Sequence, residues 1–201
     1  TLVIFTSDNG PWKNFGTHGG TCRPLREGKG TMWEGGCRVP FVARWPGRIP
    51  PGTASDAIAA TVDILPTVAE ITGAELPPHT LDGISILSLL EGRDGAPPRD
   101  HFVYYYGNQL QAVRKGPWKL HFPHKYRTYE GFEPGKDGWP GPTGQAECGW
   151  ELYHLEKDIG ETTDLAADHP DVVARLKALG SAHREELGKN KRAPGKVDAS
   201  P

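Results

Sequence analysis

The sequence predicts an α/β sheet with flanking helices, followed by a small α+β subdomain of antiparallel strands and a packed helix. The first observation is a strand-like run of β-branched and aromatic residues at 1–6. The second is a helical pattern with start and stop signals at 63–73. The third is a pair of strand-like runs joined by a short turn between 110 and 122, with an amphipathic helix after Pro170.

The bulk composition is that of a globular domain or of a piece of a larger one: 201 residues, 36% hydrophobic and 24% charged. The formal net charge of -2 provides no basic surface for nucleic acid or an anionic membrane. No apolar run approaches the length that crosses a bilayer. The 26 glycines and 19 prolines predict many turns and long ordered loops, where functional residues commonly lie.

The opening segment, Thr1 to Thr6, is apolar on both faces of the predicted strand. Such strands are typical of a sheet covered on both sides, which is usually parallel. A second apolar strand is expected at Val39 to Ala43. Because a strand of this kind needs neighbours on both sides, we expect further sequence, with any signal peptide, before Thr1.

A helix is predicted from Ile64 to Thr72, with Asp63 as its N-cap and Gly73 as its C-terminal stop. A shorter helix, Ser85 to Glu91, is expected to end at Gly92. The apolar face of the first helix is expected to consist of Ile64, Val68 and Ile71.

Strands are expected at His101 to Tyr106 and at Leu110 to Arg114. The dipeptide Lys115-Gly116 then turns the chain into a further strand, Trp118 to Phe122, which completes a hairpin. Glu151 to Leu155 has the composition of one more strand.

Pro123 to Gly149 is rich in glycine, proline and aromatic residues and is expected to be one long loop. The last element is an amphipathic helix that begins at Pro170. Residues 189–201 are expected to form a flexible tail. The apolar stripe of the helix is formed by Val172, Val173, Leu176 and Leu179.

The three cysteines, Cys22, Cys37 and Cys148, are an odd number and show no Cys-x-x-Cys spacing. This pattern argues against a zinc site and favours buried or free thiols. One disulfide with one free thiol is the alternative in an oxidising compartment.

Two segments carry candidate chemistry. Asp8 and Asn9 follow the opening strand directly, and their carboxylate and amide oxygens suit a hard cation such as Ca²⁺. Taken alone, an Asx-turn explains the same residues. Lys29 has glycine on both sides, which lets the backbone approach an anionic ligand closely. Taken alone, a solvated lysine in a flexible loop is the favoured interpretation.

The combination is specific, because the order and spacing of many motifs resemble the type I, formylglycine-dependent sulfatase family, arylsulfatase-like in character. The resemblance covers about nine-tenths of the chain. Its motifs are Ser7-Asp8-Asn9-Gly10, Leu25 to Thr31, Trp33-Glu34-Gly35-Gly36, Val39-Pro40, Trp45-Pro46-Gly47, Val62 to Thr67, Leu81-Asp82-Gly83, Ala112-Val113-Arg114, Trp118-Lys119, Glu151-Leu152-Tyr153, Asp158 and Gly160-Glu161.

The resemblance implies an alkaline-phosphatase-like fold, with residues 1–98 as the C-terminal part of the catalytic α/β domain and residues 99–188 as the C-terminal subdomain. By similarity, Asp8 and Asn9 bind calcium and Lys29 binds the sulfate group. The family nucleophile is a formylglycine made from cysteine in a Cys-x-Pro-x-Arg segment. We expect this segment and the remaining calcium ligands to lie in a part of the protein that precedes this chain, which should then be inactive alone.

Three histidines are further candidates. His18 lies on a glycine-rich loop and is a candidate contact for substrate or leaving group. His124, with the nearby His121, lies after the predicted hairpin and is a candidate substrate contact from the subdomain. A surface position without a role explains each of them equally well.

The implied function is hydrolysis of a small-molecule or carbohydrate sulfate ester in a periplasmic, extracellular or lysosomal setting. One alternative is a phosphoester hydrolase of the same superfamily, but its members usually carry Asp-His where this chain has Asp8-Asn9. The other alternative is a non-catalytic pseudo-enzyme or carbohydrate-binding fragment.

Overall fold

The computed structural model describes residues 1–93, 95 and 99–189. The described residues form two compact units, the first within Thr1–Asp8 and Pro40–Phe102 and the second within Asn9–Val39 and the chain from Val103 to Lys189. The expected division at residue 98 stays a prediction. Apart from Lys189, the expected tail lies outside the described residues. The structure contains both helices and strands, in agreement with the predicted fold class.

In the first unit, β1 (Val3–Thr6) pairs with β2 (Phe41–Arg44) in antiparallel register, with Val3 opposite Arg44. The expectation of a parallel, covered sheet is therefore wrong for this pair. Phe5 is 65% exposed and Val42 60% exposed, so the described residues of the unit leave much of the apolar surface of the ribbon uncovered.

The helical part of the first unit comprises η2 (Thr61–Asp63), α2 (Ile64–Thr72) and α3 (Leu87–Leu90). The predicted bounds of α2 are confirmed, and Gly73 ends it with φ of 71°, a conformation that favours glycine. The predicted buried face is wrong. The residues of α2 that are buried are Pro66, Thr67 and Ala69, and Val68 is 40% exposed.

Asp63 stands at the N-cap position of α2 but makes no side-chain cap hydrogen bond to that helix. Its fully buried carboxylate instead accepts hydrogen bonds from the backbone N–H groups of Ala60 (2.8 Å) and Ile84 (3.0 Å), and it pairs with Arg99. The side chain therefore joins three segments of the first unit, a role that a local capping pattern does not reveal.

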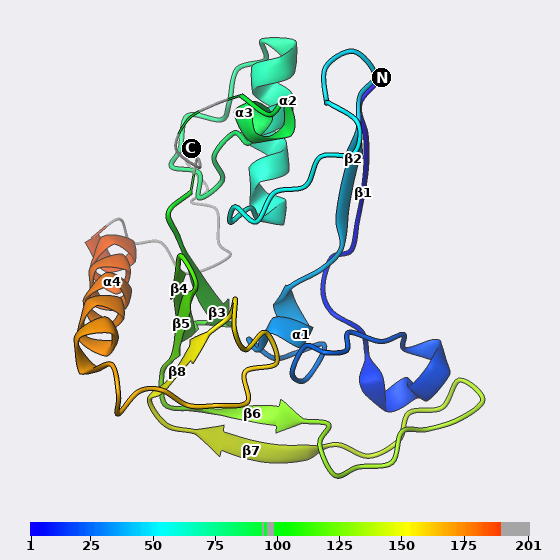
Figure 1. The fold of residues 1–201 in the computed structure, drawn as a ribbon, viewed down its shortest axis with the longest axis vertical. Helices are drawn as coiled ribbons and strands as arrows, with labels where there is room; N and C mark the ends of the chain where they lie inside the picture. The colour runs from blue at the N-terminus through cyan, green and yellow to red at the C-terminus, as the bar shows by residue number, and fades with distance from the viewer. Residues whose placement is uncertain (94, 96–98, 190–201) are drawn as a thin grey trace. The chain divides into compact units, whose positions relative to one another are not determined.

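A four-stranded sheet has the strand order β3 (His101–Tyr106), β4 (Gln109–Lys115), β5 (Trp118–His121) and β8 (Glu151–His154). The pairs β4–β5 and β5–β8 are antiparallel, and apart from the first two residues of β3 the sheet belongs to the second unit. The helix α4 (Pro170–Lys189) lies along this sheet (Figure 1) and contacts β4 and β5. The predicted strands and the predicted start of the helix are confirmed. The core between sheet and helix contains Leu110, Val113, Leu120, Phe122, Leu152, Val172, Val173 and Leu176.

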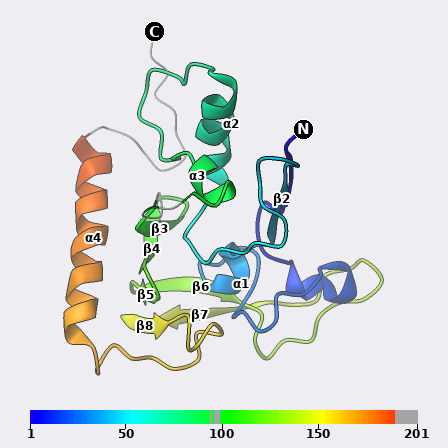
Figure 2. The same cartoon turned by 45° about the horizontal axis from the view of Figure 1, so that its top comes forward.

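The segment expected to be one long loop contains a second antiparallel ribbon, which corrects that expectation. Its strands are β6 (His124–Thr128) and β7 (Gly144–Cys148), with His124 opposite Cys148 in the register. Figure 2 shows the two strands side by side, with a long connection beyond their ends. A second core cluster packs around this ribbon and contains Trp33, Tyr126, Cys148, Tyr153 and Leu155.

Two short helices complete the second unit, η1 (Lys13–His18) and α1 (Glu34–Cys37). The turn before α1 packs tightly against it, because a Cβ atom at Gly35 would lie 2.2 Å from the carbonyl oxygen of Arg26. Of the helices in the described part of the chain, none combines the length and the apolar character needed to cross a membrane.

Candidate active site

Lys29 lies on a loop whose backbone is fixed from both sides. Its N–H group donates to the carbonyl oxygen of Pro11 (2.9 Å), and the hydroxyl of Tyr129 donates to its carbonyl oxygen (2.6 Å). A Cβ atom at Gly28 would lie 2.7 Å from the Pro11 oxygen, and Gly30 has φ of +85°. Both flanking glycines are therefore required by geometry, as the sequence suggested.

Glu27 joins this loop to the β6–β7 ribbon. Its side chain is only 1% exposed, and its carboxylate accepts hydrogen bonds from the hydroxyl of Thr128 (2.6 Å) and from the backbone N–H of Tyr129 (2.9 Å). Glu27 also has φ of 58°, a left-handed conformation that is uncommon for residues other than glycine. A buried carboxylate with two donors of this kind fixes the position of the residues next to Lys29.

The half-buried side chain of Lys29 lies beside an aromatic ring. Its Nζ is 5.1 Å from the centre of the Trp12 ring, which is within the range of a cation–π contact. An ammonium group that is carried on a rigid loop and is still partly exposed to solvent is suited to binding an anionic group of a ligand.

Behind the loop lies a buried network of charged side chains. Lys119 Nζ is 2.9 Å from Glu34 Oε1 and 3.0 Å from Glu161 Oε1. Glu161 also lies 2.9 Å from His121 Nε2 and accepts a hydrogen bond of 2.6 Å from the backbone N–H of Glu34. All four side chains are at most 1% exposed. The network ties α1 to β5 and to the segment after β8.

The pKa values of this network follow from burial and mutual attraction. Burial alone would lower the pKa of Lys119, but the charges of Glu161 and Glu34 outweigh burial and raise it. Burial alone would raise the pKa of Glu161, but Lys119 and His121 bring it down to about 2. Burial lowers the pKa of His121 to about 4. At neutral pH the network therefore holds a charged lysine, a charged Glu161 and a neutral His121.

Trp33 fills the space between this network and the Lys29 loop. It is fully buried and stacks on His121, with ring centres 3.9 Å apart. The guanidinium of Arg26 lies 3.7 Å from the centre of the Trp33 ring and donates to the hydroxyl of Tyr153 (3.1 Å). These contacts explain why Trp33 and the neighbouring Glu34 support the loop without themselves facing a ligand.

The five predicted site residues are divided between the two units. Asp8 belongs to the first unit and is exposed, whereas Asn9, His18, Lys29 and His124 belong to the second. His18 is exposed at the end of η1, and His124 is buried, with 6% exposure, at the start of β6. The expected roles of all five in calcium binding, substrate binding or catalysis stay predictions.

Asp8 and Asn9 have the chemistry that calcium requires, because both offer oxygen donors. Two residues do not supply the six to eight oxygen ligands that calcium takes. Within the described residues, Asp8 is not part of a group of three or more His, Cys, Asp or Glu side chains placed to hold a metal ion. The oxygen donors of the pair are compatible with part of a calcium site, and the remaining ligands of such a site would have to come from other residues.

The three cysteines bear on two expectations from the sequence, the place of the Cys-x-Pro-x-Arg segment and the possibility of a disulfide. Cys22 to Arg26 has the sequence Cys-x-Pro-x-Arg, so the expectation that this segment occurs only outside the chain is wrong. In the structure, the Cys22 thiol donates to the carbonyl oxygen of Glu27 (3.1 Å), and Arg26 is engaged by Tyr153. All three cysteines are free, so the disulfide alternative is not realised.

Sequence reasoning missed the residues that support the site. Glu27, Lys119 and Glu161 are charged, and charged residues are usually exposed, so no local pattern signalled their burial. The available signal was their place inside the family motifs next to Lys29, Trp118 and Gly160.

Comparisons with known proteins agree on the family. A model described as the C-terminal region of aryl-sulfatase matches residues 97–200, and a model described as N-sulphoglucosamine sulphohydrolase, C-terminal, matches residues 28–137. Arylsulfatase A of Homo sapiens is 39% identical over 194 residues, which is 89% of this chain and 37% of that protein. N-acetylgalactosamine-6-sulfatase of Sus scrofa is 33% identical over 202 residues, 93% of this chain and 38% of that protein.

A solved structure gives the same answer. The PsFucS1 sulfatase from Pseudoalteromonas sp. superposes with a TM-score of 0.78 and 26% sequence identity, over 98% of this chain and 38% of that one. The chain thus spans well under half the length of these relatives. It belongs to the sulfatase family and corresponds to the C-terminal region of arylsulfatase-like members.

Proposed function

We propose that the full-length protein hydrolyses sulfate esters and that this chain supplies a sulfate-binding lysine and part of a calcium site. The observation that carries the proposal is the Lys29 loop. Glycine geometry and the buried Glu27 carboxylate fix its backbone, while the Lys29 side chain stays partly exposed to solvent. Fixed placement of a cation is what stabilisation of a reacting anion requires.

In this reaction, Lys29 holds the sulfate group and stabilises the negative charge that develops on its oxygens. Asp8 and Asn9 would hold calcium, which supplies further positive charge at the same oxygens. His18, on the exposed end of η1, would contact the substrate or its leaving group. The formylglycine nucleophile would come from a Cys-x-Pro-x-Arg segment elsewhere in the protein, because the Cys22 thiol and Arg26 are both engaged within the supporting structure.

The proposed substrate is a small-molecule or carbohydrate sulfate ester. One relative is named for a sulfated amino sugar, N-acetylgalactosamine 6-sulfate, which supports the carbohydrate class. The proposed setting is periplasmic, extracellular or lysosomal. Asp8 followed by Asn9 gives oxygen donors only, which favours calcium and sulfate over the zinc sites of related phosphoester hydrolases.

The test compares a sulfate ester with the phosphate ester of the same chromogenic alcohol, using the full-length protein. We expect kcat/KM to be higher for the sulfate ester, and we expect Cys22→Ala to retain it because Cys22 is not the nucleophile. Preference for the phosphate ester would move the protein to the phosphoester class. Turnover of neither ester, with formylglycine detected by mass spectrometry, would leave the binding-fragment alternative. Loss of turnover in a folded Cys22→Ala protein would overturn the assignment of the nucleophile.

A further inference from the structure

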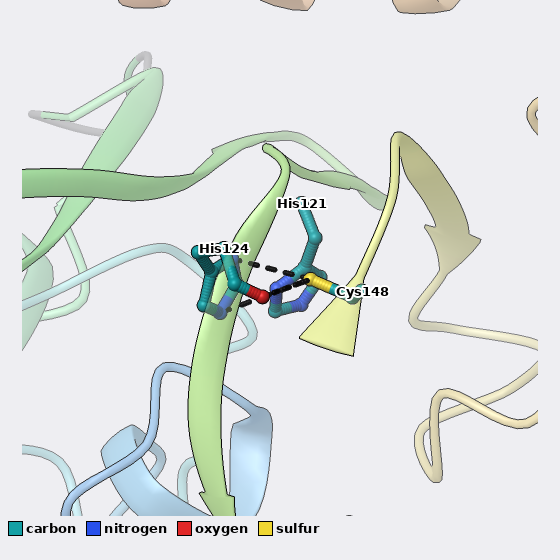
Figure 3. Close-up of side chains that lie close together, drawn as sticks. All are labelled: His121, His124 and Cys148. Atoms are coloured by element: carbon teal, nitrogen blue, oxygen red, sulfur yellow. Dashed lines mark hydrogen bonds between the residues drawn. The ribbon is translucent and has the colours of Figure 1, made fainter. Parts of the chain in front are cut away.

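Three buried side chains with metal-binding atoms meet at one point of the second unit, apart from the Lys29 loop. They are His121, His124 and Cys148, and their candidate ligand atoms all lie within 4.8 Å of one another (Figure 3). In the described part of the chain this is the one such group of His, Cys, Asp and Glu residues. None of the three side chains is more than 7% exposed.

The fold brings the three residues together although they are far apart in sequence. His121 ends β5, His124 begins β6 after a connection of two residues, and Cys148 ends β7 directly opposite His124. The positions are therefore set by two strand pairings and one short turn. Rigid strands hold ligands more accurately than loops do.

Each of the two imidazole rings is oriented through a contact of one of its nitrogens. The second nitrogen of each ring is then left for a ligand. The Nε2 of His121 lies 2.9 Å from the Glu161 carboxylate, and the Nδ1 of His124 lies 2.6 Å from the carbonyl oxygen of Phe122. Carboxylate and carbonyl partners on the outer nitrogen are the usual way in which metal-binding histidines are oriented. The nitrogens that remain are Nδ1 of His121 and Nε2 of His124.

The polar atoms of these three side chains are not all provided with good hydrogen-bond partners. The buried Nδ1 of His121 has no hydrogen-bond partner among the described residues. The sulfur of Cys148 lies 3.6 Å from the carbonyl oxygen of Phe122 and 3.2 Å from Nδ1 of His124, a nitrogen that already serves the Phe122 oxygen. A thiol is a weak donor, and buried polar atoms without partners cost free energy.

From these contacts we propose that His121, His124 and Cys148 form a binding site for Zn²⁺. The sulfur of Cys148 and Nε2 of His124 are 3.8 Å apart. Zinc–nitrogen and zinc–sulfur bonds of about 2.0 and 2.3 Å in a tetrahedral site separate such atoms by about 3.5 Å. Coordination by two nitrogens and one sulfur, with water as the fourth ligand, therefore requires the three ligand atoms, which lie within 4.8 Å of one another, to draw closer. The sulfur must also move from beside Nδ1 of His124, where it lies at 3.2 Å, towards Nε2.

Binding requires the Cys148 thiol to give its proton to solvent, so that the thiolate, two neutral imidazoles and Zn²⁺ share a net charge of +1. The two strands and Trp33, which stacks on His121, enclose the site. The ion would therefore fix the β6–β7 ribbon against β5 and would not take part in ester hydrolysis.

The test titrates the full-length protein, stripped of metal, with Co²⁺ as a spectroscopic substitute for zinc. We expect a thiolate-to-cobalt charge-transfer band that Zn²⁺ abolishes in competition, and zinc retained in the untreated protein by elemental analysis. Cys148→Ala should remove the band and weaken zinc binding by more than about 100-fold, beyond the cost of disturbing an outer partner alone.

Two variants separate this site from the proposed sulfatase site and from the other thiols. Cys22→Ala and Lys29→Ala should each keep the band, since neither residue belongs to the group of three. If Cys148→Ala does not fold, His124→Gln supplies the same test. A charge-transfer band that persists in both ligand variants, or a wild-type protein that gives no band and retains no zinc, would overturn the proposal.

Discussion

Replacement of Lys29 by alanine in the full-length protein is expected to reduce kcat for sulfate esters by about 100-fold or more, the usual cost of removing a donor that stabilises developing charge. The protein should remain folded. The loop backbone is held through the N–H and C=O groups of Lys29 and through Glu27, which the substitution leaves in place. The substitution removes the contact with Trp12, worth about 0.5–2 kcal/mol depending on how far the ammonium is desolvated.

The matched control is Lys125→Ala. Lys125 pairs with Glu147 at 3.0 Å on the surface of the ribbon, and its side chain is 76% exposed. Removing this lysine changes the total charge by the same amount but should leave kcat unchanged. Steady-state kinetics on the two variants decide the matter, and a Lys29→Ala enzyme with wild-type kcat would remove Lys29 from the reaction.

Replacement of Lys119 by methionine is expected to have the largest effect on stability. Without the ammonium, the carboxylates of Glu34 and Glu161 remain in the interior without their cation. Breaking a buried ion pair by removing one partner typically costs about 3–5 kcal/mol, whereas loss of an exposed pair costs about 0–1 kcal/mol. Lys125→Met is therefore the control, and the midpoints of urea unfolding are the measurement.

A double variant gives a sharper form of this test. Adding Glu34→Gln to Lys119→Met removes one of the two buried carboxylate charges that have lost their cation. The double variant should therefore unfold at a higher urea concentration than Lys119→Met alone. If Lys119→Met were as stable as the wild-type protein, the buried network would not hold α1 behind the Lys29 loop as described.

Patterns in the sequence predicted the elements whose signals are local. The strands around the Lys115-Gly116 turn and the helix after Pro170 have regular apolar spacing and clear end signals, and the structure contains them. The β6–β7 ribbon was missed because glycine and proline dominate its segment, while its pairing depends on residues about twenty apart. The buried face of α2 was predicted wrongly because the residues that cover it come from other segments, which the pattern within the helix does not reveal.

For the candidate site, too, the sequence predicted the local features and not the contacts between distant residues. The glycines beside Lys29 signalled close backbone approach, and the structure supplies the reason at Gly28 and Gly30. The supporting Glu27 could not be predicted, since its two donors lie about one hundred residues away. The group of His121, His124 and Cys148 was missed for a related reason. Its spacing matches no common zinc pattern, and only the strand register joins its members.

Calcium dependence tests the central claim most directly, because the claim joins Asp8, Asn9 and Lys29 in one sulfate-binding site. The measurement is the rate of sulfate release by the full-length protein before chelation, after chelation, and after addition of Ca²⁺ or Zn²⁺ separately. We expect chelation to abolish turnover and Ca²⁺ alone to restore it. Full activity after chelation, or recovery with Zn²⁺ but not with Ca²⁺, would contradict the account.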